Sequence, residues 1–215
     1  MYLFVDLAYV LGLLIANRLE VPGNLAETAR RIVASETLYR IALSSQLIGS
    51  LCTVLLAFGL YGAVKPIGKN LALLALLFRL VEATIFALGV LFSFVVLKTY
   101  IDSDYLKAFG FNQPSVLVNL RSAFYSNSFT IAGIFFSFGS ILFFYLFLKS
   151  TYIPKVLSAF GLLTSALVTI ISFMELILPR YAAMLQFGWG PLALAEILVG
   201  LWLLFKGVNL KPREK

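Results

Sequence analysis

The sequence predicts an all-α polytopic transmembrane bundle of six spans, forming a single integral membrane domain over residues 1–215. Hydrophobic residues make up 61% of the chain, charged residues make up 13%, and the mean hydropathy is +0.97. That charged fraction is about half the usual value for a soluble domain, so a water-soluble fold could not cover so much apolar surface. The apolar residues also form runs of roughly twenty, the length of helix that crosses a ~30 Å hydrocarbon core. The runs lack the apolar and polar alternation of membrane strands.

Six apolar runs are the predicted spans, and short polar or basic segments separate them. They cover about residues 1–17, 38–64, 71–97, 126–148, 155–178 and 191–205. The first run is short and contains Asp6. A cleaved signal peptide is the alternative for this run, but a basic leader and a clear cleavage site are missing.

Two short amphipathic helices are predicted in the outer loops. Asn24 and Glu27 have the spacing of a capping box, which predicts a helix through Ala34 along the membrane interface. Residues 35–36 then restart a helix that becomes the second span. A second interfacial segment is predicted around residues 114–123, where apolar residues mix with Arg121.

The basic residues predict the orientation of the chain. Three segments on one predicted side, 65–69, 149–155 and 206–215, carry eight Lys and Arg residues against the single acid Glu214. The opposite side also carries eight basic residues, but over longer loops that contain five acids. Short basic loops favour the cytoplasmic side, so we expect a cell-membrane protein with both termini in the cytoplasm.

Several classes of function are disfavoured by what the sequence lacks. The net charge of +7 lies at the ends of apolar runs, so we interpret it as topological and expect no nucleic-acid partner. The chain has no histidine, and Cys52 is its only cysteine, so we expect no metal and no cofactor. Nucleophile-elbow and phosphate-loop motifs are also missing. An enzyme would have to use carboxylates and hydroxyls alone, which makes it the third hypothesis.

Ionisable residues at membrane depth are the candidate site. Arg79 and Glu82 share one face of the third span. Arg79 lies ten residues from Lys69, and Glu196 lies ten residues from Lys206, so both are roughly 15 Å deep from the same side. This equal depth predicts an ion pair between spans three and six, with Asp6 at a broadly similar level.

The charges of these residues do not balance. If Asp6, Glu82 and Glu196 all ionise, one arginine leaves two surplus negative charges in a low-dielectric region. At least one carboxyl is therefore expected to be protonated or to face a hydrated cavity. The group is either a proton or ligand site, or a structural clasp between helices.

Two weaker features are also predicted. Gln46, Asn127 and Glu175 lie near the outer boundary, where they either line a vestibule or merely cap helices and meet lipid headgroups. Small residues in the fourth span, from Gly133 to Ser140, either let helices of the bundle approach one another or form a dimer face.

Five blocks of the sequence resemble one family in order. They are 21–29 (VPGNLAETA), 35–40 (SETLYR), 78–83 (FRLVEA), 195–196 (AE) and 201–207 (LWLLFKG). The chain is similar to the prokaryotic membrane family catalogued as domain of unknown function 4386. It departs from the family pattern at Asn24, where an Asp is common, and in a first span that begins abruptly at Met1. The resemblance implies a six-span prokaryotic membrane protein and draws attention to Arg40, Arg79, Glu82 and Glu196, but it supplies no activity.

Two main hypotheses for function follow. The first is the binding or transport of a small molecule or lipid at the charged group of Arg79, Glu82 and Glu196, which predicts a cavity that reaches these residues. The second is a structural or accessory membrane subunit that binds a partner protein. Membrane lipids are expected partners under both hypotheses, and the sequence does not predict an oligomeric state.

Overall fold

The computed structural model describes residues 1–21, 24–101, 114–150, 152–178, 180 and 186–207, and the regular structure in these ranges is helical. The elements are α1 (Tyr2–Leu19), α2 (Leu25–Ala34), α3 (Glu36–Val64), α4 (Lys69–Ile101), α6 (Pro114–Lys149), α7 (Lys155–Ile177), η1 (Gln186–Gly188) and α9 (Trp189–Phe205).

Five of these helices are long and apolar enough to cross a membrane: α1, α3, α4, α6 and α7. The sixth apolar helix, α9, has 17 residues, which is about 26 Å of helix. Each predicted span corresponds to one of these six helices, so the helical membrane-bundle fold class is confirmed. The chain is an integral membrane protein.

The chain divides into two compact units, and four helices, α1, α3, α4 and α6, contribute residues to both. Unit 1 comprises Met1–Leu3, Cys52–Ala83 and Thr130–Lys215, while unit 2 comprises Phe4–Leu51 and Thr84–Phe129. Unit 1 therefore contains α7 and α9, whereas unit 2 contains α2 and most of α1.

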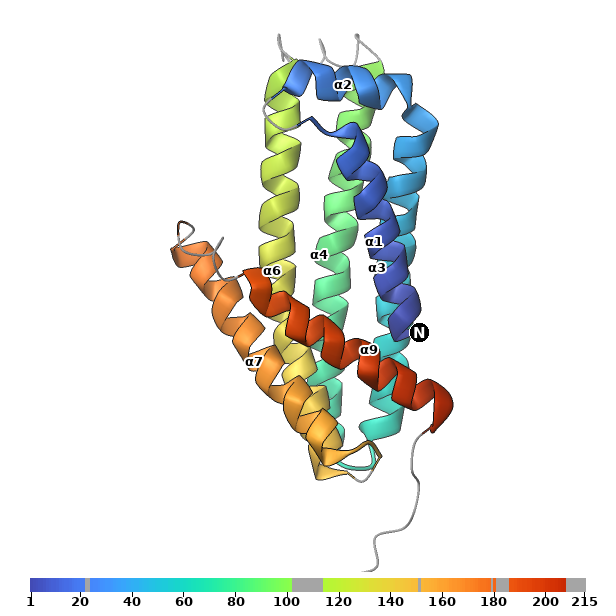
Figure 1. The fold of residues 1–215 in the computed structure, drawn as a ribbon, viewed down its shortest axis with the longest axis vertical. Coiled ribbons are helices and arrows are strands. Elements are labelled where there is room, and N and C mark those ends of the chain that lie inside the picture. Colours follow the sequence, from blue (N-terminus) through green and yellow to red (C-terminus); the bar gives the residue numbers. More distant parts are fainter. Residues whose placement is uncertain (22–23, 102–113, 151, 179, 181–185, 208–215) are drawn as a thin grey trace, which may run out of the picture. The chain divides into compact units, whose positions relative to one another are not determined.

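Unit 2 has a small apolar core beneath α2, which lies across the ends of the unit's long helices (Figure 1). The core contains Ile32 from α2 and Tyr39 and Leu43 from α3, and it also includes Val90 and Leu97 from α4. Ile32 is completely buried. The apolar face of α2 is thus fixed against the unit, as expected of an amphipathic helix.

The predicted cap of α2 is confirmed in one of its two halves. The Asn24 side chain accepts a hydrogen bond from the Glu27 backbone N–H at 3.0 Å, which satisfies a free donor of the first turn. The Glu27 carboxylate does not return the contact, because it instead accepts hydrogen bonds from Arg30 and Arg31. Glu27 is therefore the centre of a charged cluster on α2.

The prediction of a separate interfacial helix around residues 114–123 is wrong. Helix α6 is continuous from Pro114 to Lys149, so these residues are the first turns of the fourth apolar helix. Proline occupies only its first position, where it is compatible with a helix, and the first glycine comes at Gly133. With no breaker between these positions, the local mixture of polar and apolar residues does not end the helix.

Small residues bring the helices of unit 1 together. The buried face of α7 consists mainly of Ser, Thr and Gly, including Ser165 and Gly161. A β-carbon at Gly161 would lie 2.2 Å from the ring of Phe144 on α6, so only glycine fits there. Helix α9 packs obliquely against α7 (Figure 1). This is the close packing that small residues permit between membrane helices.

Candidate functional site

Unit 1 brings Arg79, Glu82 and Glu196 together. Arg79 Nε lies 3.1 Å from Glu82 Oε2 on the same helix, and Arg79 Nη1 lies 4.0 Å from Glu196 Oε1 on α9. The three side chains are 4%, 5% and 9% exposed, so the charges are removed from solvent. A buried arginine therefore lies between two carboxylates that come from different helices.

Helix α6 completes the surroundings of Arg79. The guanidinium carbon lies 4.6 Å from the ring centroid of Phe136, within the range of a cation–π interaction. Gly139 lies beside the aliphatic stem, and a β-carbon at Gly139 would be 3.0 Å from Arg79 Cδ. The arginine is thus enclosed by α4, α6 and α9.

The other predicted site residues are described by their burial and by the unit to which each belongs. Asp6 is half-buried on α1 and belongs to unit 2, while Glu175 is half-buried on α7 and belongs to unit 1. Gln46 and Asn127 both belong to unit 2, but Gln46 is buried and Asn127 is exposed. Among the proposed vestibule residues, Gln46 lines the cavity described below.

The small residues of α6 lie against side chains of their own unit. A β-carbon at Gly133 would be 2.8 Å from the Trp189 ring, and the corresponding contact of Gly139 is with Arg79. The Trp189 ring also stacks on Phe136 with 6.1 Å between the ring centroids. These two glycines therefore contribute to packing within unit 1.

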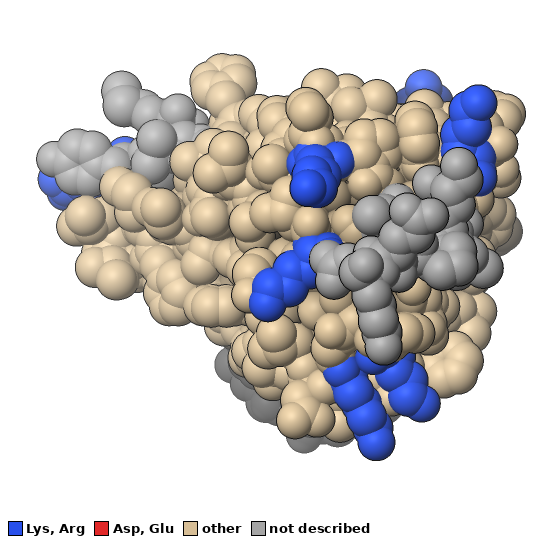
Figure 2. Space-filling model, turned by 90° about the horizontal axis from the view of Figure 1, so that it is seen from below, with Lys and Arg blue, Asp and Glu red and all other residues tan. Residues whose placement is uncertain are grey.

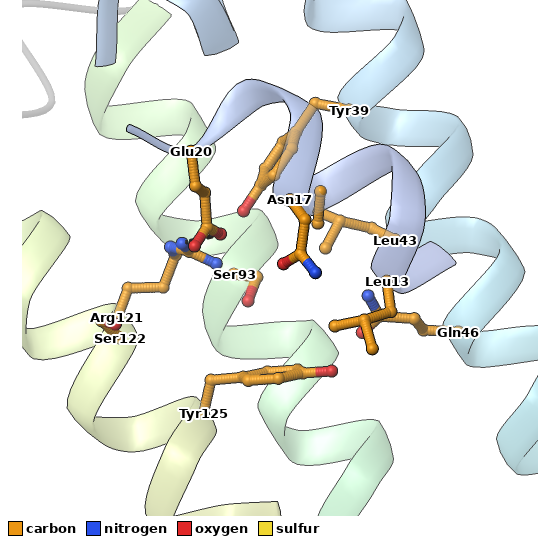
Figure 3. Close-up of a pocket in the computed structure, with 11 residues that line it drawn as sticks. Leu13, Asn17, Glu20, Tyr39, Leu43, Gln46, Ser93, Arg121, Ser122 and Tyr125 are labelled. Carbon is orange, nitrogen blue, oxygen red and sulfur yellow. Dashed lines mark hydrogen bonds and ion pairs between the residues drawn. The ribbon is translucent and has the colours of Figure 1, made fainter. Parts of the chain in front are cut away.

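Unit 2 contains a polar cavity of about 150 Å³ between α1, α3, α4 and α6 (Figure 3). Its polar lining residues are Asn17, Glu20, Tyr39, Gln46, Ser93, Arg121, Ser122 and Tyr125. The apolar remainder is Leu13, Ala16 and Leu43. A cavity this rich in hydrogen-bonding groups is suited to water or to a polar ligand.

An ion pair between Glu20 and Arg121 forms one wall of this cavity. Arg121 Nη2 donates a hydrogen bond to Glu20 Oε1, and Figure 3 shows the two side chains meeting from α1 and α6. The Arg121 side chain is 6% exposed and that of Glu20 is 34% exposed. The pair is therefore buried on the arginine side and accessible on the carboxylate side.

The position of Glu20 is unfavourable for α1 taken alone. Its backbone N–H donates to the carbonyl of Ala16, so the carboxylate sits at the carboxyl end of the helix, where the dipole is negative. Arg121 offsets this repulsion. The acid therefore contributes to the cavity wall rather than to the stability of α1.

Close helix approach holds the remaining cavity residues in place. A β-carbon at Gly12 would lie 2.6 Å from Gln46 Cγ and 2.8 Å from the Ala42 carbonyl, so glycine lets α1 lie directly against α3. Tyr39 is 1% exposed, and its ring centroid lies 5.9 Å from the guanidinium carbon of Arg121. The aromatic ring fixes Arg121 from the side of α3.

The sequence did not predict the Glu20–Arg121 pair. Both residues counted only as loop charges on the outer side, and Arg121 belonged to a predicted interfacial segment. The available signal was their opposite charge at the ends of two apolar runs expected on the same side. The pair is 101 residues apart in sequence, and no spacing rule links such positions.

The chain was also compared with known proteins. No curated protein and no solved structure matches it. Residues 1–207 match the family described as "Domain of unknown function (DUF4386)", which is almost the whole chain. The chain therefore belongs to the DUF4386 family.

Proposed function

We propose that this protein binds a small polar molecule at the cavity of unit 2, within the membrane-embedded bundle. The observation that carries the proposal is the Glu20–Arg121 pair, a buried cation and a partly exposed acid at the wall of a polar cavity. Ligand sites typically combine a few fixed polar groups with an apolar lining.

The cavity's size and charge suggest the ligand class. Its volume of about 150 Å³ equals the liquid volume of about five water molecules, so the ligand is a small one. Glu20 and Arg121 neutralise each other, which favours a zwitterion or a neutral molecule with several hydroxyls. Leu13, Asn17 and Ser122 are exposed lining residues, so the cavity reaches the surface of the unit.

The cluster of Arg79, Glu82 and Glu196 is proposed to be a structural clasp. Its packing against Phe136 and Gly139 supports this role, and its three charged residues line neither the polar cavity of unit 2 nor an apolar groove between α3 and α9 of unit 1. Binding or transport at this cluster is the alternative, and it would require water to enter beside Arg79.

A thermal-shift experiment on the detergent-solubilised full chain tests the proposed cavity. The probes are glycine, glycerol, ethanolamine and acetate, which represent a zwitterion, a neutral polyol, a cation and an anion. We expect glycine or glycerol to raise the melting temperature and the two singly charged probes to have a smaller effect. At a concentration 100 times the dissociation constant, binding stabilises the fold by about 2.7 kcal/mol.

Two alanines of α1 provide a matched pair of variants for this test. Ala16 and Ala8 are both buried in unit 2, at 7% and 8% exposure, but only Ala16 is among the lining residues of the cavity. Ala16→Leu should abolish the shift, whereas Ala8→Leu should retain it. Equal shifts in the two variants, or no shift with any probe in the wild-type chain, would contradict the proposal.

We further propose that the basic end of unit 1 faces the cytoplasm of a cell membrane, with both termini on that side. Figure 2 shows Lys and Arg side chains on this end and no visible Asp or Glu. The exposed lysines at the helix ends of the unit are Lys65, Lys69, Lys149, Lys155 and Lys206. Such clustering in short loops is the usual signal for the cytoplasmic side.

Cysteine labelling in oriented vesicles tests this orientation. In a Cys52→Ser background, Lys155→Cys should react with a membrane-impermeant maleimide in inside-out vesicles and stay unlabelled in right-side-out vesicles. Arg30→Cys on the exposed face of α2 is the control. It should be labelled in right-side-out vesicles and stay unlabelled in inside-out vesicles. The reverse labelling pattern would overturn the proposed orientation.

A further inference from the structure

Unit 1 contains a second cavity, an apolar groove of about 340 Å³ between α3 and α9. The walls come mainly from Leu55, Leu56, Gly59, Leu60 and Ala63 of α3 and from Gly200, Leu203 and Leu204 of α9. Met1, Tyr2 and Phe147 complete the lining. The volume lies in the usual range of ligand sites, and the lining is mostly hydrocarbon.

Both walls of the groove end at an exposed lysine. Lys65 follows Ala63 by two residues at the end of α3, and Lys206 follows Leu204 by two residues at the end of α9. Both lysines are exposed and belong to unit 1. Positive charge therefore lies at one end of an otherwise apolar groove.

The length of the groove matches one leaflet of a bilayer. Leu55 lies ten residues from Lys65, which is roughly 15 Å of helix. Half of a ~30 Å hydrocarbon core is about the same length. An acyl chain that enters at the lysines would therefore follow the groove toward the middle of the membrane.

We infer that this groove binds one acyl chain of an anionic phospholipid, whose phosphate lies between Lys65 and Lys206. The charge at the open end selects an anionic headgroup, and the groove accepts the chain. Basic pockets between membrane helices are known positions for such headgroups. This lipid site is independent of the polar cavity in unit 2.

Two glycines of α3 provide a variant that fills the groove and a matched control that does not. A β-carbon at Gly59 or at Gly62 would meet nothing within 4 Å, so a side chain fits at either position. Gly59 lines the groove, whereas Gly62 is exposed and is not among its lining residues. Gly59→Leu therefore occupies the groove, and Gly62→Leu adds the same side chain on the same helix elsewhere.

The lysines also have a matched control pair. Lys69 and Lys155 are exposed at the same end of unit 1, but they begin α4 and α7, which contribute no lining residue to the groove within the described part of the chain. Lys65→Gln/Lys206→Gln removes the charges at the groove. Lys69→Gln/Lys155→Gln removes two equivalent charges outside it.

Native mass spectrometry of the full chain in detergent micelles, titrated with phosphatidylglycerol or with phosphatidylcholine of the same acyl chains, tests the inference. We expect one molecule of phosphatidylglycerol to bind tightly and phosphatidylcholine to bind more weakly. Each lysine contributes about fivefold to the affinity, so Lys65→Gln/Lys206→Gln should lower it by about 25-fold. Gly59→Leu should abolish the binding of this lipid, while Gly62→Leu and Lys69→Gln/Lys155→Gln should leave it within about twofold of the wild type.

Three results would overturn the inference. Equal binding of the two lipids would mean that no anionic site exists. Equal losses in the two lysine double variants would indicate general surface attraction rather than a site at the groove. Unchanged binding in Gly59→Leu, with a circular dichroism spectrum and melting temperature like those of Gly62→Leu, would show that the acyl chain lies elsewhere.

Discussion

Arg79 and Glu196 lie on different helices of unit 1, 117 positions apart in sequence, with Nη1 and Oε1 separated by 4.0 Å. The shorter contact of Arg79 is with Glu82 on its own helix, at 3.1 Å. Glu82 therefore holds the guanidinium toward α9, and Glu196 links α4 to α9. In lipid, a charge left without these neighbours would be costly, and the proposed clasp would therefore also fix the register of the two helices.

Replacing Arg79 should be strongly destabilising. Arg79→Met leaves two buried carboxylates without their cation, and breaking a buried pair costs roughly 3–5 kcal/mol. Arg40→Met is the control, because its ion pair with Glu36 is exposed and should contribute about 0–1 kcal/mol. Chemical denaturation in detergent micelles, followed by circular dichroism, measures both losses. Similar losses for the two variants would argue against the clasp.

The sequence was sufficient to predict the helices and the contact between Arg79 and Glu196. Apolar length defines a membrane helix almost independently of its neighbours, so the predicted spans agree with α1, α3, α4, α6, α7 and α9. Counting ten residues from Lys69 and from Lys206 placed Arg79 and Glu196 at equal depth, and they do meet. The rise of a helix is constant, which makes the distance along a helix readable from a sequence.

The polar cavity could not be predicted in the same way. Its position depends on which helices are neighbours and on their rotation, and neither property is encoded in span length. Glu20 and Arg121 lie at helix ends, where charged residues are ordinary and attract no attention. Gly12 shows the same difficulty, because its role depends on the approach of Gln46 from another helix.

Alanine substitutions at Gly161 and at Gly62 should change the stability of the fold in opposite directions. A β-carbon at Gly161 would overlap the buried ring of Phe144, so Gly161→Ala should cost roughly 1–3 kcal/mol through overpacking. Gly62→Ala enters open space and should stabilise α3 by about 0.5–1 kcal/mol. Thermal unfolding in detergent measures both changes. A neutral result at Gly161 would mean that α6 and α7 are not in close contact.

Glu20 and Arg121 should be energetically coupled. A double-mutant cycle with Glu20→Gln and Arg121→Gln should give a coupling energy of roughly 1–3 kcal/mol, because the arginine side of the pair is buried. The exposed pair of Glu36 and Arg40, measured in a parallel cycle, should give about 0.3–0.5 kcal/mol. If the two cycles give the same coupling energy, the Glu20–Arg121 pair is no stronger than an exposed surface ion pair.

Glu27 should make the local stability of α2 depend on pH in the acid range. The side-chain hydrogen bonds from Arg30 and then from Arg31 lower the pKa of Glu27 from 4.5 to about 2. A carboxyl whose pKa is lower in the folded than in the unfolded chain stabilises the fold above the unfolded value. That contribution should therefore be complete above pH 4.5 and decline as the pH falls toward 2.

Carboxyl-carbon NMR of the full chain in detergent micelles measures this titration directly, with the Glu27 signal assigned by its loss in Glu27→Gln. The wild-type signal should titrate near pH 2. In Arg30→Gln/Arg31→Gln, both hydrogen-bond donors to the carboxylate are lost, so the midpoint should rise toward 4.5. Hydrogen exchange of the α2 amides should show the matching loss of protection between pH 4.5 and 2 in the wild type only. Titration near 4.5 in both chains would mean that the two arginines do not form these hydrogen bonds to Glu27 in solution.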